Sequence, residues 1–450
     1  MTEISRTLLL ICLIFAWINP RANEFLESLV KGTPVTPALS GLQVSLMRKG
    51  SLWKEFALGN ALVTPRQERA LRTDHKVRVA SISKLLVAIG VLQLVEARQL
   101  DLDQEAAKFL GWRLRNPNFP NLPITIRSLL SHTSSVRDGT GYFIPAGAGK
   151  LSDFFAPESD LWGQGSHWAS DVKEKPGQYF YYANLNFGLL AELIEKTSGQ
   201  RFDRYMTEKV LAPLNITARF NPCAIAANQL AAGYRKRDSA GVWSPLGPWL
   251  SQIDADSPDC FYGMKNLNDP QIFLDKYKLG SNASLFSPQG GLRASASDLV
   301  AILGMLARGG ELGGRKILSS LSVDAMLSSE WSLNRRGDNG RSSGESEPNG
   351  PRDGLMSDYG LSVHRINLGS WGFKNGPRLM LGHLGNAYGV LSFALLDPDS
   401  GNGIAAIITG VSDDPSKFPG HSPLYRVQEK LLGWWLDFHI DDPSAASNSL

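Results

Sequence analysis

Three short stretches of the chain carry residue types that suit hydrolysis by a serine nucleophile. The first is Ser81-Ile82-Ser83-Lys84, which leads into an apolar run that extends to Leu92. Residues three apart share a helix face, so the side chains of Ser81 and Lys84 can touch. A serine hydroxyl needs a base to accept its proton, and a lysine whose pKa is lowered by burial can be that base. At the first turn of the predicted buried helix, the Ser81 N–H is also free to meet an oxyanion.

The Ser-x-x-Lys spacing alone is a weak signal, because it also occurs at Ser51–Lys54 and Ser170–Lys173. Neither of these begins an apolar helix, since the first falls in an expected hairpin and the second in a polar stretch. Context therefore selects Ser81 and Lys84 as the catalytic pair.

The second stretch is Tyr182-Ala183-Asn184, which follows an aromatic cluster. A tyrosine can act as a general base or acid if nearby cations lower its pKa, and Lys84 is a candidate cation. Asn184 is then placed to hydrogen-bond a substrate amide. The alternative is an aromatic cluster that only packs in a core.

The third stretch is His383-Leu384-Gly385-Asn386, just before an apolar strand. A glycine such as Gly385 lets backbone approach a substrate closely. The N–H of Asn386 is a candidate second oxyanion donor. A lone histidine near a strand is usually structural, so His383 gains weight only together with the other two stretches.

The elements that must position these residues are strands at both ends of the chain and helices in the middle. This order predicts an α+β fold, in which an antiparallel sheet domain flanked by helices is built from both ends of the chain and carries an inserted mainly helical domain. The expected elements are a hairpin over 42–58, strands over 390–396 and 404–409, and helices over 189–196, 202–211 and 424–438.

At 450 residues the chain is too long for one ordinary core. We expect residues 35–105 and 285–440 to form the sheet domain and residues 106–284 the inserted helical domain. Residues 441–450 resemble a flexible tail. The polar, Gly- and Ser-rich stretch over 334–353 predicts a solvated loop.

The N-terminus reads as a targeting segment. An apolar stretch over 8–18 follows Arg6 and ends before Pro20, and at about a dozen residues it is shorter than a membrane span. It predicts a signal peptide over residues 1–22, with an uncleaved N-terminal anchor as the alternative. Either places the catalytic body outside the cytoplasm, periplasmic or secreted.

Composition excludes several classes of protein. With 43% hydrophobic and 20% charged residues the chain is globular, and its net charge of +3 without a Lys/Arg-rich run predicts no nucleic-acid partner. The seven histidines are scattered, so no zinc site or other cofactor is expected, and no Gly-x-Ser-x-Gly elbow occurs. Cys223 and Cys260 form one disulfide or stay two buried thiols.

The motifs, taken in order, resemble the serine β-lactamase and penicillin-binding-protein superfamily, specifically its class C β-lactamase-like branch. The likeness runs from roughly residue 40 to 436. Further segments that carry it are Leu129-Leu130-Ser131-His132-Thr133-Ser134, Pro176-Gly177, Gly290-Gly291-Leu292 with Ser295 and Asp298, and Tyr359-Gly360-Leu361.

The resemblance implies a role for each site residue. Ser81 would be the nucleophile and Lys84 its proton acceptor, while Tyr182 would pass the proton to the leaving group and activate the deacylating water. The N–H groups of Ser81 and Asn386 would form the oxyanion hole. Direct substrate contacts would come from Asn184, His383 and Gly385.

Two departures from the family pattern stand out. His383 occupies the place of the lysine of Lys-Thr-Gly in true β-lactamases, and a histidine is mostly uncharged at neutral pH. The His-x-Gly form is similar to family esterases, amidases and D-amino-acid peptidases. Ser135 stands where the family usually has glycine, which affects only the local loop.

We therefore expect an exported serine hydrolase that forms an acyl-enzyme with an ester, an amide or a D-amino-acid peptide. Its partner would be that small-molecule or peptide substrate, with membrane contact only through an uncleaved N-terminal segment. One alternative is a catalytically silent penicillin-binding-like sensor, whose sign would be loss of Ser81, Lys84 or Tyr182. The other is a true β-lactamase, although weak or absent β-lactamase activity is expected from His383.

Overall fold

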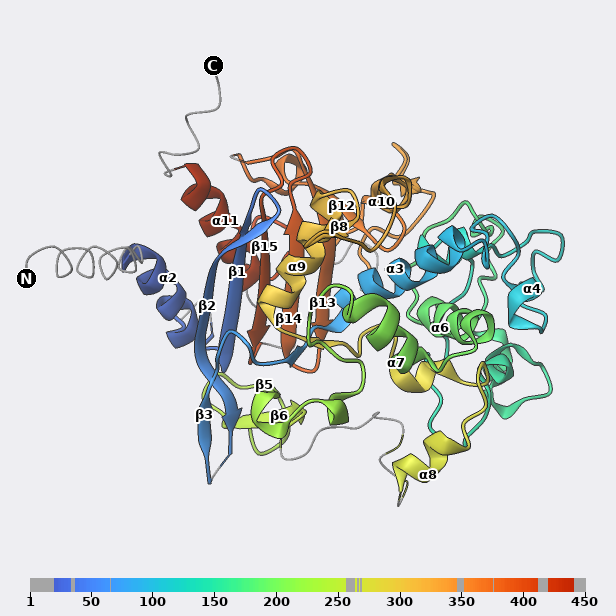
Figure 1. The fold of residues 1–450 in the computed structure, drawn as a ribbon, viewed down its shortest axis with the longest axis horizontal. Coiled ribbons are helices and arrows are strands. Elements are labelled where there is room, and N and C mark those ends of the chain that lie inside the picture. Colours follow the sequence, from blue (N-terminus) through green and yellow to red (C-terminus); the bar gives the residue numbers. More distant parts are fainter. Residues whose placement is uncertain are drawn as a thin grey trace, which may run out of the picture.

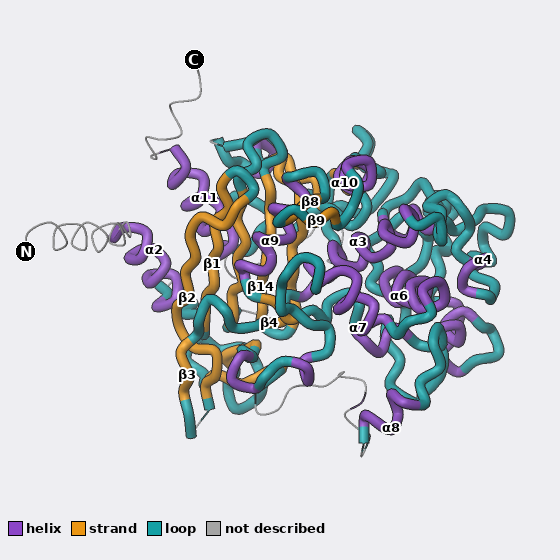
Figure 2. Tube along the Cα trace, viewed as in Figure 1, coloured by secondary structure: helices purple, strands orange, loops and turns teal. Residues whose placement is uncertain are grey.

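The computed structural model describes residues 20–33, 37–64, 66–255, 264, 267, 269–345, 352–374, 376–411 and 420–440. Within these ranges, a nine-stranded sheet stands beside a mainly helical half of the molecule (Figures 1 and 2). The strand order is β10-β11-β12-β13-β14-β15-β1-β2-β3, and every neighbouring pair is antiparallel. Strands from both ends of the chain therefore meet where β15 pairs with β1, which confirms the predicted fold class.

The strands of the large sheet are β1 (Gly41–Arg48), β2 (Ser51–Val63), β3 (Glu68–Ala70), β10 (Trp331–Ser332), β11 (Asp358–Tyr359), β12 (His364–Asn367), β13 (Leu379–Ala387), β14 (Val390–Leu396) and β15 (Gly403–Thr409). Three two-stranded pairs are β4 (Val77–Arg78) with β7 (Arg293–Ala294), β5 (Gly233–Lys236) with β6 (Trp249–Ile253), and β8 (Glu311–Leu312) with β9 (Arg315–Lys316). The β5–β6 pair lies within residues 106–284, where the sequence shows few strand-like runs.

The predicted N-terminal hairpin is confirmed as β1 and β2. Its two loop residues, Lys49 and Gly50, have φ angles of 49° and 73°. Positive φ at both positions is the conformation whose twist matches that of two antiparallel strands. Arg48 then pairs with Ser51, and an irregularity between Leu46 and Met47 shifts the register by one residue over the rest of the hairpin.

The helices are α2 (Pro20–Lys31), α3 (Ser83–Glu96), α4 (Ala107–Leu110), α5 (Ile126–Leu130), α6 (Leu185–Ser198), α7 (Phe202–Tyr205), α8 (Pro270–Asp275), α9 (Ala296–Ala307), α10 (Ser320–Leu327) and α11 (Arg426–Ile440). Shorter helical turns are η1 (Ala80–Ile82), η2 (Leu151–Phe155), η3 (Asp160–Gly165), η4 (Met206–Leu211), η5 (Pro222–Ala224), η6 (Ala227–Gln229), η8 (Ala283–Phe286) and η9 (Gly369–Trp371).

The predicted helices are present, with one difference. Helix α6 ends at Gly199, whose φ of 68° makes it the left-handed cap that the sequence predicts. The helix expected over 202–211 begins as α7 and continues as the π-helical turn η4. Both lie before Pro213, which lacks the N–H that a longer helix needs.

Apolar side chains pack on both faces of the sheet. In β15, Ile404, Ala406 and Ile408 join the core that contains residues of α2 and α11, whereas Ala405 and Ile407 face the core that contains α9. Alternation along a strand sends successive side chains to opposite faces. Figure 1 shows α2 and α11 on one side of the sheet and α9 on the other.

The ends of the chain fall largely outside the described residues. Of the predicted leader over 1–22, only the start of α2 is described, and the predicted tail over 441–450 is not described. In the ranges given above, no helix is both long enough and apolar enough to cross a bilayer. Cys223 is disulfide-bonded, and the other two cysteines of the chain lie outside these ranges.

A buried ion pair joins Asp254, which follows β6, to Arg293 of β7, the strand before α9. The guanidinium of Arg293 donates to both carboxylate oxygens of Asp254 at 2.9 Å, and the two side chains are 3% and 0% exposed. Removing one partner leaves an uncompensated buried charge, so Asp254→Ala should lower the free energy of unfolding by about 3–5 kcal/mol. A fall in the urea midpoint would show it. As the matched control, Asp74→Ala breaks the exposed pair with Arg72 and should leave the midpoint unchanged; equal effects would contradict the prediction.

Candidate active site

Ser81 and Lys84 lie one helical turn apart where η1 runs into α3. Lys84 Nζ donates to Ser81 Oγ at 3.0 Å, and it also reaches Asn184 Oδ1 at 2.9 Å and the carbonyl oxygen of Gln289 at 2.8 Å. All three protons of an ammonium group thus have acceptors in place. The contact expected from the Ser-x-x-Lys spacing is present.

Burial sets the protonation state of Lys84. Its side chain is fully buried, because α3 is enclosed by apolar residues on all sides over its first three turns. Loss of hydration lowers the pKa of Lys84 to about 7, although the carboxylates of Glu345 and Asp138 oppose part of this fall. Near neutral pH a substantial fraction of Lys84 is therefore an uncharged amine that can accept the proton of Ser81.

Tyr182 meets the same serine from the other side. Tyr182 lines the pocket together with Ser81, whose hydroxyl acts to lower the pKa of the phenol, and Lys84 Nζ lies 4.9 Å from the centre of the Tyr182 ring. Burial raises the pKa of Tyr182 well above its usual value, and Tyr359 and Glu345 add to this rise. The condition set out from the sequence, that nearby cations lower the pKa of Tyr182, is therefore not met, because loss of hydration dominates. Tyr182 is a neutral phenol that can donate a proton.

His132 holds Tyr182 in place from behind. The two rings stack with their centres 4.2 Å apart and an angle of 25° between their planes. His132 Nδ1 accepts a hydrogen bond from the Ala183 N–H at 3.1 Å, which fixes the backbone next to the phenol. Ser135, three residues further on, has a φ of 67°, the region that favours glycine. Ser135 thus adopts the backbone conformation that a glycine would take at this position.

The side-chain amide of Asn184 is fully occupied. Its oxygen accepts from Lys84, while Nδ2 donates to Asp138 Oδ2 at 3.0 Å and to Glu345 Oε1 at 2.8 Å. Burial raises the pKa of Asp138 to about 6. For Asn184 to bind a substrate amide, the substrate must replace one of these partners, and Glu345 is the exposed one. The predicted contact between Asn184 and substrate stays a prediction.

His383 lies behind the pocket and does not line it. Its side chain is fully buried, with Nε2 3.1 Å from the Tyr359 hydroxyl and Nδ1 2.6 Å from the Leu384 carbonyl oxygen. Burial holds the pKa of His383 well below its usual value, so the ring is neutral. The prediction that His383 contacts the substrate directly is therefore wrong, because its side chain is buried and does not line the pocket. The ring instead stands behind Tyr182, with 6.4 Å between ring centres.

Gly385 and Asn386 line the pocket together with Ser81. The ladder between β12 and β13 ends where His364 pairs with Gly382, so β13 continues beyond β12 towards η1. A Cβ atom on Gly385 would collide with the Ser392 hydroxyl and lie 2.6 Å from the carbonyl oxygen of Val79. Only glycine lets β13 pack this closely against the segment that carries Ser81. The oxyanion hole of Ser81 and Asn386 stays a prediction that this arrangement suits.

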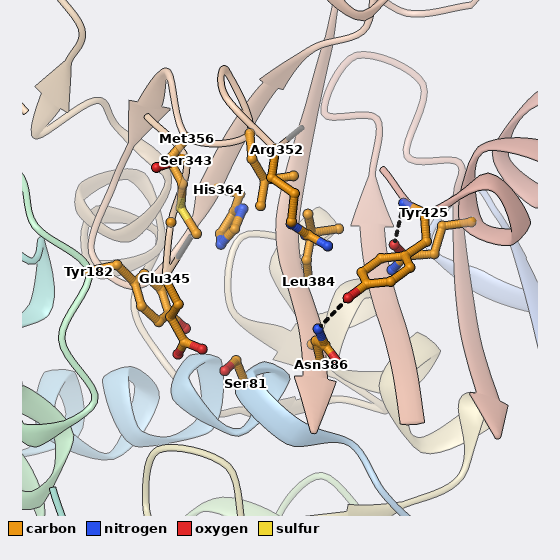
Figure 3. A pocket seen from close by; sticks show the side chains of 14 residues that line it. Ser81, Tyr182, Ser343, Glu345, Arg352, Met356, His364, Leu384, Asn386 and Tyr425 are labelled. Atoms are coloured by element: carbon orange, nitrogen blue, oxygen red, sulfur yellow. Dashed lines mark hydrogen bonds between the residues drawn. The ribbon is translucent and has the colours of Figure 1, made fainter. Parts of the chain in front are cut away.

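The pocket also contains residues that the sequence analysis missed. Figure 3 shows Glu345 on the Tyr182 side of Ser81, and Arg352 on the side of Leu384, Asn386 and Tyr425. The prediction of a solvated loop over 334–353 is therefore wrong for Glu345 and Arg352, which supply part of the pocket wall. No periodicity or motif marks these positions in the sequence. The further lining residues are Ser343, Gly344, Leu355, Met356, His364 and Gln428.

The described residues contain no cluster of three or more histidine, cysteine or acidic side chains that could hold a metal ion. The chemistry available at the pocket is that of a hydroxyl hydrogen-bonded to an amine, with a phenol beside them. This set suits nucleophilic attack by Ser81 on a carbonyl carbon, with Lys84 as the base.

Comparison with known proteins agrees with the resemblance that the motifs indicate. A model of the family described as Beta-lactamase matches residues 26–421. Penicillin-binding protein 4* of Bacillus subtilis is 29% identical over 174 residues, which cover 38% of this chain and 36% of that protein. The D-alanyl-D-alanine-carboxypeptidase/endopeptidase AmpH of Escherichia coli is 26% identical over 211 residues, 44% of this chain and 52% of that protein. The matches thus span about half or less of these relatives' length.

Among solved structures, a D-amino acid amidase from Ochrobactrum anthropi complexed with L-phenylalanine superposes with a TM-score of 0.59. The superposition covers 93% of this chain and 98% of the amidase, at 17% sequence identity. At this identity the likeness shows a shared fold.

The low pKa of Lys84 predicts a pH dependence. Because the neutral amine is the form that accepts a proton, the rate at which a fluorophosphonate labels Ser81 should rise with pH and level off above about 7. Lys84→Ala should slow labelling by about 10²–10⁴-fold, the usual contribution of a general base. The matched control is Lys173→Ala, which removes the exposed lysine of another Ser-x-x-Lys sequence and should leave the rate unchanged. A rate that does not vary between pH 5 and 9 would contradict this role.

Proposed function

The chain belongs to the Beta-lactamase family, and from this premise we propose that it is a serine hydrolase that forms an acyl-enzyme on Ser81. The observation that carries the proposal is the 3.0 Å hydrogen bond between Lys84 Nζ and Ser81 Oγ. It joins a nucleophile to a base whose pKa is lowered to about 7. A silent relative would have no need of a buried amine with this pKa.

In the acylation step, Ser81 Oγ attacks the carbonyl carbon of the substrate and its proton passes to Lys84 Nζ. The N–H groups of Ser81 and Asn386, two residues that line the pocket, would receive the resulting oxyanion. When the tetrahedral intermediate collapses, the bond to the leaving group breaks and the neutral Tyr182 phenol donates a proton to it. The phenolate oxygen of Tyr182 then takes the proton held by Lys84 Nζ, directly or through a water molecule.

In the deacylation step, a water molecule attacks the acyl carbon of the ester on Ser81. Its proton passes to the neutral amine of Lys84, directly or through the Tyr182 hydroxyl, and the Ser81 oxygen regains a proton as the acyl group leaves. Burial keeps Tyr182 protonated, so the phenol relays this proton and does not act as a resident phenolate.

For the substrate we propose an ester, an amide or a D-amino-acid peptide. The names of the similar proteins support this class, since one is a D-alanyl-D-alanine-carboxypeptidase/endopeptidase and another a D-amino acid amidase. We expect β-lactamase activity to be weak, because His383 is buried and neutral. At this position β13 therefore offers no permanent positive charge to hold the carboxylate of a β-lactam. The N-terminal apolar stretch further supports export to the periplasm or the medium.

The acyl-enzyme is tested by labelling with a fluorophosphonate probe. The wild-type protein should be labelled and Ser81→Ala should not, because the probe bonds only to an activated serine oxygen. Ser83→Ala is a matched control, since Ser83 donates to the Ala80 carbonyl oxygen and lies outside the pocket; it should still be labelled. Equal labelling of wild type and Ser81→Ala, or of neither, would favour the silent binding protein.

The substrate class is tested with a panel on purified protein. Short acyl esters, D-aminoacyl amides, a D-Ala-D-Ala peptide and nitrocefin would be compared by kcat/KM. An ester, amide or peptide should exceed nitrocefin by about tenfold or more, the effect expected from one missing charged contact. Faster hydrolysis of nitrocefin than of every other compound would support a true β-lactamase instead.

A further inference from the structure

Three large apolar side chains are exposed close together in the chain where β5 turns back into β6. Val242 is 57% exposed, Leu246 96% and Leu250 42%. Half-buried Trp243 and Trp249 belong to the same stretch. Single exposed apolar residues are common on protein surfaces, but a group of them marks a surface that contacts something else. We call residues 236–250 the β5–β6 tip.

The β5–β6 tip lies at an edge of the molecule and away from the pocket. Figure 1 shows β5 and β6 below the large sheet, and residues 236–250 are not among the described residues that line the pocket around Ser81. Gly233, the first residue of β5, sets its position. A Cβ atom there would lie 2.6 Å from the carbonyl oxygen of Tyr388, in the turn between β13 and β14. The tip is therefore packed closely against the large sheet.

Cationic side chains lie at the base of the β5–β6 tip. Residues 235–237 are arginine, lysine and arginine, and Asp238 is the one acidic residue between 234 and 253. The ammonium group of Lys236 lies 4.8 Å from the centre of the Trp249 ring and donates to the Pro245 carbonyl oxygen at 3.1 Å. The stretch is thus positively charged, and one of its cations is held against an aromatic ring of the tip.

The backbone of the tip has partners of its own. Asp238 Oδ1 accepts from the N–H groups of Ala240 and Val242, both at 2.9 Å. Pro245 and Pro248 carry no N–H group at all. An N–H group without a partner costs free energy when it leaves water. The tip therefore has few donors that oppose its transfer into a less polar phase.

These properties suit the surface of an anionic bilayer. Tryptophan concentrates at the membrane interface, and lysine and arginine reach the headgroups while their stems stay among apolar groups. Binding at this interface grows with the apolar area inserted and with attraction to anionic lipids. A stable protein partner needs about 800 Å² of fitted surface on each side, and three aliphatic side chains supply only a part of that area.

We propose that the β5–β6 tip docks on anionic lipid bilayers, with Val242, Leu246 and Leu250 inserted among the lipids and Lys236 at the level of the headgroups. This inference goes beyond the proposed hydrolase function and does not depend on it. It adds a contact to the one expected from an uncleaved N-terminal segment, and this contact persists after the leader is removed. Docking brings the sheet that lines the pocket to the membrane surface.

Hydrogen–deuterium exchange on the full chain measures this contact locally and separates it from binding by the N-terminal segment. Vesicles that contain phosphatidylglycerol should slow exchange over residues 236–250. Vesicles of phosphatidylcholine alone should need about tenfold or more lipid for half-maximal protection, because they lack the charge that attracts Lys and Arg. The internal control is the β8–β9 pair, which is also exposed and cationic but turns through Gly313 and Gly314. Its exchange should not change.

Leu246→Ser should raise the lipid concentration for half-maximal protection by about tenfold or more, the effect of keeping one leucine side chain in water. The matched control is Leu321→Ser, which removes an aliphatic side chain that is 79% exposed on α10 and should leave protection unchanged. Both variants should keep the melting temperature and the fluorophosphonate labelling of the wild type.

Three outcomes would overturn the proposal: no protection over residues 236–250, equal protection by both kinds of vesicle, or protection that survives in folded Leu246→Ser. Protection that rises with protein concentration and not with lipid would overturn it in favour of a second copy of the chain on the β5–β6 tip. Failure of Ser81 labelling with intact protection by lipid would overturn only the hydrolase function.

Discussion

Removal of the Lys84 amine from water is the constraint on which the active site depends. An ammonium group in an apolar interior loses hydration, so burial favours the neutral form and makes a lysine into a base near neutral pH. This requires a helix that is apolar on all sides, and α3 meets the requirement between the sheet and the helical half. The same burial keeps the Tyr182 phenol protonated. One physical effect therefore sets the pKa of the proposed base, Lys84, and of the proposed acid, Tyr182.

The sheet brings the third part of the site to this helix. Strand β13 continues past the end of β12, and Gly385 lets its backbone contact the segment before Ser81. The approach depends on β1 pairing with β15, because that pairing closes the sheet from the two ends of the chain. Residues about 300 positions apart in sequence thus meet through backbone geometry, and a side chain at Gly385 would separate them.

A part of the fold or of the site can be predicted only where its residues form a recognisable sequence pattern. Ser81 and Lys84 are identifiable because a motif spacing coincides with a fully apolar helix, and the strands because of their alternation and turn residues. The orientation of His383 was beyond the sequence, since a strand has two faces and only the register decides between them. The pKa of Tyr182 depends on burial competing with a nearby cation, which no local pattern reports. Glu345 and Arg352 lie in a stretch without periodicity, where polar composition indicates solvent and not a pocket.

The residues proposed to carry out the reaction and the charged residues that line the pocket lie in different kinds of structure. Ser81, Lys84 and Tyr182 lie on or beside α3 and α6, where packing and hydrogen bonds fix them. The charged residues that line the pocket, Glu345 and Arg352, lie in described parts of the chain between β10 and β11 that form no helix or strand. Loops tolerate substitution more readily than packed helices. A substitution of Glu345 or Arg352 can therefore change the charge of the pocket wall while the hydrogen bond between Lys84 and Ser81 stays intact, so motifs that identify the reaction need not identify the substrate.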